Sequence, residues 1–218
     1  MATIVVGVEE SERSLDALAL ARRLAGCGDT LLLVCAYPAD PLMSGGGGAT
    51  YGRALRAHAE ATLAEVGGET GCGTLAVPDR HPAHALAQVG AEVGAAAIVV
   101  GSSHTGRLRR IVPGSTGEHL LEAAPCAVVV APRDYRRHAE RPIEVVACAY
   151  DGTPKAGRVL AVAEEIARRH GAALRIVQVV EPSEVVDAVL AVDPQGAAAA
   201  RRIRQRPLDE LRRVVGEL

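Results

Sequence analysis

The 218-residue sequence has almost no aromatic side chains: it contains no Trp, no Phe and only four Tyr. Proteins that bind single-stranded nucleic acids stack the bases on aromatic rings along positively charged grooves. The formal net charge of this chain is −2. Both properties argue against a nucleic-acid-binding protein.

Long apolar runs and cysteine motifs are also absent. No stretch reaches the roughly 20 apolar residues that a helix needs to cross a membrane, and residues 1–8 lack the layout of a signal peptide. The five cysteines form no C-x-x-C pair and have no His spacing suited to zinc. Cys35, Cys126 and Cys148 fall in apolar strand patterns, so we interpret them as small buried side chains. We expect a cytoplasmic protein that does not associate with membranes.

Common catalytic and phosphate-binding signatures are missing as well. A Walker loop requires Gly-Lys-Ser/Thr, and the dinucleotide fingerprint requires three glycines within six residues. Residues 98–116 contain neither, since only Gly101 and Gly106 are available there, and the sequence has no G-x-S-x-G elbow. Ser115 with His104 or His119 has no evident acid to orient the imidazole. We therefore expect no dedicated catalytic centre.

One segment does have the composition of a phosphate site. An apolar run at residues 98–100 stops at Gly101, as buried parallel strands do where they end. A helix is predicted to begin at residues 114–116 and to run to Ala123, with Ser and Thr available as caps. Free backbone N–H groups at such a helix start bind anions. The loop between adds positive charge from Arg107, Arg109 and Arg110.

Short apolar strands alternate with helical patterns along the first part of the chain. Short apolar strand patterns occur at residues 4–8, 31–37, 74–77, 98–100 and 125–132. The first helix would bury a face made of Leu15, Leu18, Ala21 and Ala25, and another helix follows residue 82. This alternation predicts a parallel α/β sheet with helices on both faces. In such sheets, ligands bind beyond the carboxyl ends of the strands, where the strand order reverses.

The loop and its surroundings resemble the universal stress protein family. The family's nucleotide signature is G-x2-G-x9-G-[S/T]: Gly101 fills the first position, Gly114-Ser115 fill the last pair, and His104 stands at the second glycine. The family's first strand ends in Val-Asp-Gly-Ser, where this chain has Val8-Glu9-Glu10-Ser11. The resemblance covers residues 1–132 and implies an open, parallel, five-stranded Rossmann-like sheet of order 3-2-1-4-5.

This resemblance implies an adenine nucleotide, ATP or AMP, between the ends of the first and fourth strands. The family's adenine-contacting Asp becomes Glu9, which is one methylene longer. Mg²⁺ beside a triphosphate is an option, although a single carboxylate is a weak metal site. Any ATP hydrolysis would be slow and incidental. The implied site comprises Gly7, Val8, Glu9, Ala36, Val100, Gly101, His104, Gly114, Ser115 and Thr116.

The departure at His104 leaves several alternatives open. A positive φ is uncommon for His, so the residue could strain the loop, donate to a phosphate, or stand as an ordinary surface histidine. The functional alternatives follow. The chain is a stress-response regulator whose nucleotide state biases a partner surface, or a family member without nucleotide that serves as a dimerisation or interaction module. A flavin or dinucleotide enzyme is disfavoured by the missing fingerprint.

A shorter second copy of the pattern follows. Residues 133–142 are predicted to be an exposed linker, with Arg136 and Arg137 solvated. Strands at residues 145–150 and 174–180 flank a helix at 156–170, whose inward face would contain Val159, Val162, Ala163 and Ile166. We therefore predict a complete domain at 1–132, a linker at 133–142 and a partial second domain at 143–218. Because the family's last strand commonly pairs with a counterpart, the resemblance also implies a homodimer through Ala127–Val130.

Overall fold

The computed structural model describes residues 1–38, 46–68, 71–102, 114–178, 213 and 216. The chain forms two compact units, Met1–Arg141 and Pro142–Leu218. Among the described residues, no helix is both long enough and apolar enough to cross a bilayer.

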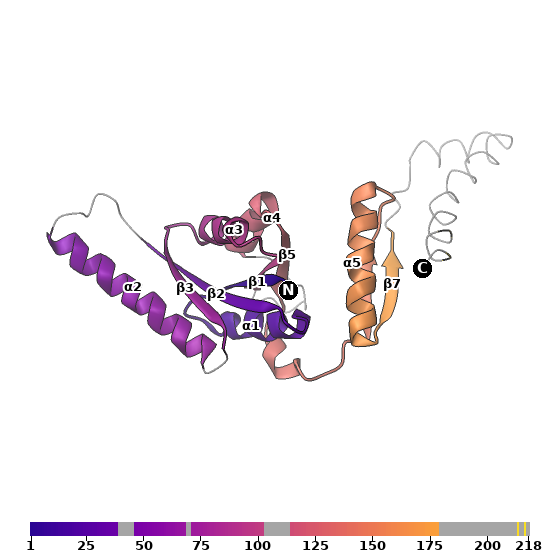
Figure 1. The fold of residues 1–218 in the computed structure, drawn as a ribbon, viewed down its shortest axis with the longest axis horizontal. Helices are drawn as coiled ribbons and strands as arrows, with labels where there is room; N and C mark the ends of the chain where they lie inside the picture. Colours follow the sequence, from indigo (N-terminus) through magenta and orange to yellow (C-terminus); the bar gives the residue numbers. More distant parts are fainter. Residues whose placement is uncertain (39–45, 69–70, 103–113, 179–212, 214–215, 217–218) are drawn as a thin grey trace, which may run out of the picture. The chain divides into compact units, whose positions relative to one another are not determined.

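The first unit contains a five-stranded sheet of order β3-β2-β1-β4-β5 (Figure 1). All neighbouring strands are parallel, and Val6 of the central strand lies opposite Leu33 on one side and Val99 on the other. The order predicted from the family resemblance is confirmed. The strands are β1 (Thr3–Gly7), β2 (Thr30–Tyr37), β3 (Gly73–Pro78), β4 (Ala97–Gly101) and β5 (Ala127–Ala131).

Helices cover both faces of this sheet, as the alternating pattern predicts. Leu18 of α1 and Leu63 of α2 are buried with Val6 on one face, whereas Leu86 of α3 and Leu120 of α4 are buried on the other. Figure 1 shows α3 and α4 on the opposite side of the sheet from α1. Helix α2 was not expected from the sequence. The bounds are α1 (Glu12–Leu24), α2 (Gly46–Gly67), α3 (Pro82–Glu92) and α4 (Ser115–Ala123).

The predicted inward face of α1 is wrong by part of a turn. Leu18 and Ala21 are buried as expected, but Leu15 is 39% exposed and Ser14 is only 1% exposed. The helix presents small residues such as Ala17 to the sheet. Small side chains allow the helix backbone to approach the strands closely, so hydrophobicity alone does not identify the buried face.

Most of residues 133–142 are exposed, as expected of a linker, but part of this segment packs against the first unit. A 3-10 helix, η1 (Tyr135–His138), packs against α1. The Asp16 carboxylate accepts hydrogen bonds from the backbone N–H groups of Asp134 at 2.9 Å and Arg136 at 3.0 Å. The Arg136 side chain is 23% exposed, so the expectation that it is solvated is wrong, whereas Arg137 is 65% exposed.

The second unit contains β6 (Val145–Ala149), α5 (Pro154–His170) and β7 (Ala173–Val177), with the two strands parallel. Thr153 caps α5 by accepting a hydrogen bond from the Ala156 N–H at 3.2 Å. One sheet face packs against Leu160 and Ala163 of α5. Val159 and Val162 are 54% and 60% exposed, so their assignment to the buried face is wrong. The identity of residues 143–218 as a partial second copy stays a prediction.

Candidate functional site

A cavity of about 490 Å³ opens at the carboxyl edge of the five-stranded sheet. Its floor is formed by the ends of β1, β2 and β4, and its walls by α2, α3 and the starts of α1 and α4. His104 lies outside the described residues. The other predicted site residues all line this cavity: Gly7, Val8, Glu9, Ala36, Val100, Gly101, Gly114, Ser115 and Thr116.

The two strand-end glycines allow helices to approach the cavity floor. A Cβ at Gly7 would lie 3.0 Å from the Leu86 side chain of α3. A Cβ at Gly101 would lie 2.6 Å from the backbone oxygen of Arg13 and 2.7 Å from its Cβ. The sequence analysis reads Gly101 as part of a phosphate signature, and the structure adds a packing requirement: only glycine leaves room for α1 at this point.

The turn between β1 and α1 fixes the position of Glu9. The buried Ser14 hydroxyl donates to the Glu9 backbone oxygen at 2.7 Å and accepts from the Glu9 N–H at 2.8 Å. The Glu9 carboxylate accepts from the Ser11 hydroxyl at 2.9 Å and pairs with Arg13, whose Nε is 3.3 Å from Glu9 Oε1. Ser14 and Arg13 are cavity residues that the sequence reasoning missed.

Helix α2 supplies a wall that the sequence reasoning did not include. Leu55, His58, Ala59 and Thr62 line the cavity from this helix. His58 Nε2 lies 3.0 Å from Glu10 Oε2, which joins α2 to the turn after β1. The recurrence of Leu55, Ala59 and Leu63 at intervals of four residues is the helical signal that could have identified this wall.

The start of α4 also lines the cavity. Gly114 is the N-cap and provides no side-chain cap, while Ser115 and Thr116 are the first residues of the helix. The prediction that Ser or Thr caps this helix is therefore wrong. First-turn N–H groups have no partner within a helix, and the helix dipole makes such a start attractive to anions.

The charges of the described lining residues are unevenly distributed. Glu9, Glu10 and Arg13 line the cavity, so carboxylates outnumber the guanidinium among the described residues. Burial raises the pKa of the Cys35 thiol, and the negative charge of Glu9 raises it further. The thiol is therefore a neutral part of the wall, in line with its interpretation as a small buried side chain. The described part of the chain contains no group of three His, Cys, Asp or Glu side chains placed to hold a metal.

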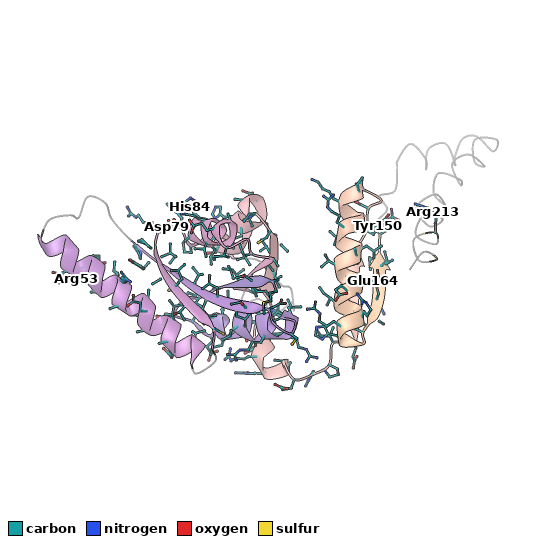
Figure 2. All side chains as sticks on the ribbon, in the orientation of Figure 1. Arg53, Asp79, His84, Tyr150, Glu164 and Arg213 are labelled. Carbon is teal, nitrogen blue, oxygen red and sulfur yellow. The ribbon has the colours of Figure 1, made fainter. Side chains whose placement is uncertain are left out.

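A further polar cluster anchors α3 beside the cavity. Asp79 Oδ2 lies 2.6 Å from His84 Nδ1, and Asp79 Oδ1 accepts from the His81 N–H at 2.8 Å. Figure 2 shows Asp79 and His84 side by side near the start of α3. Pro82, between them in sequence, lines the cavity. This cluster fixes the direction in which α3 leaves β3.

The cavity thus has the parts of a binding site for a small ligand with one anionic end. Apolar side chains such as Val34, Leu55 and Leu86 line it together with the helix start of α4. Its volume lies within the roughly 300–1,000 Å³ that is usual for small-molecule sites.

Comparisons with known proteins identify related chains. A universal stress protein of Mycobacterium tuberculosis strain H37Rv is 32% identical over 73 residues, which are 34% of this chain and 25% of that protein. The chain thus spans about a quarter of the length of the curated relatives that it matches.

The fold also occurs in a solved structure. A universal stress protein from Archaeoglobus fulgidus DSM 4304 is 18% identical with a TM-score of 0.63, over 90% of this chain and 74% of that chain. Another universal stress protein, solved in complex with cAMP, is 22% identical with a TM-score of 0.42, over 60% of this chain and 96% of that chain.

The sequence model of the universal stress protein family matches residues 1–132. These residues contain all five strands of the first unit and every described residue of the cavity. The chain therefore belongs to the universal stress protein family.

Proposed function

We propose that the first unit binds an adenine nucleotide, ATP or AMP, in the cavity at the carboxyl edge of the sheet. The observation that carries this proposal is the convergence of the ends of β1, β2 and β4 with the start of α4 on one cavity of about 490 Å³. The bound nucleotide then acts as a signal that biases a partner surface, in a stress-response regulator.

The two ends of the cavity suit the two ends of a nucleotide. The start of α4 offers backbone N–H groups and the Ser115 and Thr116 hydroxyls to phosphate. Glu9, held by Ser11, offers a carboxylate oxygen to a ribose hydroxyl or to the adenine amino group. The apolar side chains between them, Val34 and Leu86, can lie against the base.

The second functional alternative, an interaction module without nucleotide, also has an observation in its favour. Glu10 adds a second carboxylate to the cavity beside Glu9, and like charges disfavour a phosphate nearby. The two alternatives differ in a measurable property, since only the first requires a ligand in this cavity.

Calorimetric titration of the purified full chain tests the proposal. We expect ATP, with and without Mg²⁺, to bind with weak to moderate affinity, and cAMP, AMP and adenosine complete the ligand panel. Ser115→Ala combined with Gly114→Val should abolish binding, because the hydroxyl and the close backbone approach are both removed. Thr153→Ala is the matched control, since it removes a hydroxyl at the start of α5, outside the cavity. Absence of heat up to millimolar ATP would contradict the proposal and favour the interaction module.

A further inference from the structure

Arg13 occupies an unusual position in the cavity wall. It lies in the first turn of α1, and it is the only Arg or Lys among the described residues that line the cavity. In this structure its Nε lies 3.3 Å from Glu9 Oε1, and its side chain is 43% exposed. The guanidinium is therefore held by one exposed ion pair and not by burial.

The backbone of Arg13, in contrast, is firmly placed. Its carbonyl oxygen and Cβ pack against Gly101 at the end of β4, where a Cβ would lie only 2.6 Å and 2.7 Å away. Gly101 and the first residues of α4 line the same cavity. The Arg13 side chain thus starts from the floor of the cavity, beside the strand that leads toward α4.

We propose that the Arg13 guanidinium, which pairs with Glu9 in this structure, turns to bind the nucleotide phosphate when a nucleotide is bound. This inference rests on the proposed nucleotide binding and assigns a residue that sets its charge preference. When Arg13 turns to the phosphate, Glu9 keeps its hydrogen bond from Ser11 at 2.9 Å. The Glu9 carboxylate, no longer paired with Arg13, can then accept a hydrogen bond from the nucleoside.

The relative strengths of the two pairings favour this exchange. An exposed ion pair between neighbouring turns contributes little because water and salt screen it, and both Glu9 and Arg13 are exposed, by 59% and 43%. A guanidinium binds phosphate through two parallel charge-assisted hydrogen bonds. The cavity should therefore prefer ligands in the order ATP, AMP, adenosine.

The first experiment compares Arg13→Gln with the unmodified chain in calorimetric titrations with ATP and adenosine. We expect ATP to bind about tenfold more weakly, and adenosine to bind without change. Arg13→Lys, which keeps the charge and loses the second hydrogen bond, should recover part of the ATP affinity. Equal losses for ATP and adenosine, or no loss for ATP, would overturn the assignment.

Arg56→Gln is the matched control. Arg56 also forms an exposed ion pair with a residue four positions away, at 2.7 Å from Glu60, and it does not line the cavity. This change should leave both affinities unaltered. A loss equal to that of Arg13→Gln would show that the effect comes from surface charge in general and would overturn the proposal.

A double-mutant cycle with Glu9→Gln separates phosphate binding from mere neutralisation of Glu9. If Arg13 contacts phosphate, Arg13→Gln weakens ATP binding in the Glu9→Gln background as well. If Arg13 acts only through Glu9, the effect disappears in that background, and the assignment is wrong. If the unmodified chain does not bind ATP, both the proposed function and this inference are wrong. If it binds ATP and Arg13→Gln leaves the affinity unchanged, only this inference is wrong.

Discussion

The carboxylate of Asp16 binds the backbone of Arg136, 120 residues further along the chain: Asp16 Oδ1 accepts the Arg136 N–H at 3.0 Å. Asp16 is 2% exposed, and its other oxygen accepts the Asp134 N–H at 2.9 Å. The Arg136 guanidinium contacts Asp16 at 3.3 Å and also Glu12. A hydrogen bond from Arg136 holds the pKa of the Glu12 carboxyl below its usual value.

We predict that Asp16→Ala destabilises the first unit by about 3 kcal/mol, because a buried acceptor of several hydrogen bonds is lost. Urea unfolding followed by circular dichroism measures the loss, and hydrogen exchange should show faster exchange at residues 134 and 136. Glu12→Gln is the control, since Glu12 is 74% exposed and contacts the same arginine. If both changes have the same effect, the buried carboxylate has no special role.

We predict that Gly101→Ala destabilises the first unit by about 1–3 kcal/mol, the usual range for overpacking. The added methyl group would lie 2.6 Å from the Arg13 backbone oxygen, so α1 must move. Gly52→Ala in α2 is the matched control. A Cβ there meets nothing within 4 Å, and alanine in a helix is more favourable by about 0.5–1 kcal/mol. Thermal unfolding of the two variants should therefore shift in opposite directions; equal shifts would contradict the packing role of Gly101.

The pair of Asp79 and His84 predicts a dependence of stability on acid. The His84 side chain and then the His81 N–H hydrogen bond to Asp79 and lower the pKa of its carboxyl. A carboxyl with a lowered pKa in the folded state stabilises the protein fully above its ordinary pKa, and this contribution is lost as the pH falls through the folded-state value. We expect the urea concentration at the unfolding midpoint to decrease once the pH is lowered below about 4. Asp79→Asn should lower the free energy of unfolding at neutral pH by about 1 kcal/mol. The further loss of stability on acidification should be smaller in this variant than in the unmodified chain. If the urea midpoint of the variant decreases with acid as steeply as that of the unmodified chain, Asp79 does not cause the acid dependence.

The homodimer through Ala127–Val130 stays a prediction. β5 is the outermost strand of the sheet, so its outer edge has no partner strand within the described part of the chain, and apolar edges are seldom left open. Sedimentation equilibrium at tens of micromolar should give twice the mass of one chain. Val129 packs against the buried cluster, so Val129→Glu would disturb the core as well as the edge. Ala127→Lys, at an exposed position, is the cleaner variant and should yield a monomer; a monomeric unmodified chain would contradict the prediction.

The sequence identified the strands better than the helix faces. Apolar β-strands in a parallel sheet are buried on both sides, so a continuous run such as Ile4–Val6 is sufficient to locate one. A helix buries only one face, and here that face consists largely of alanine. Leu15 and Val162 are more hydrophobic than Ala17 and Ala163, yet they point outward. The predicted faces of α1 and α5 were therefore correct only in part, and the errors lie at the larger hydrophobic side chains.

The candidate site was predicted where the family signature specifies backbone positions. Gly101 and Gly114 fall at signature positions, and both line the cavity. Arg13, Ser14 and His58 could not be derived in this way. They reach the cavity because α1 and α2 pack across the sheet, and that packing depends on contacts between residues distant in sequence. His104, the one departure from the glycine pattern, lies outside the described residues.

The position of α1 has a mechanical consequence. Within one turn, this helix contacts the cavity through Arg13 and holds the segment after β5 through Asp16. Because backbone hydrogen bonds hold a helical turn together, the positions of Arg13 and Asp16 on α1 are fixed relative to each other. A substitution that moves the start of α1 should therefore disturb both the cavity and the backbone that follows β5.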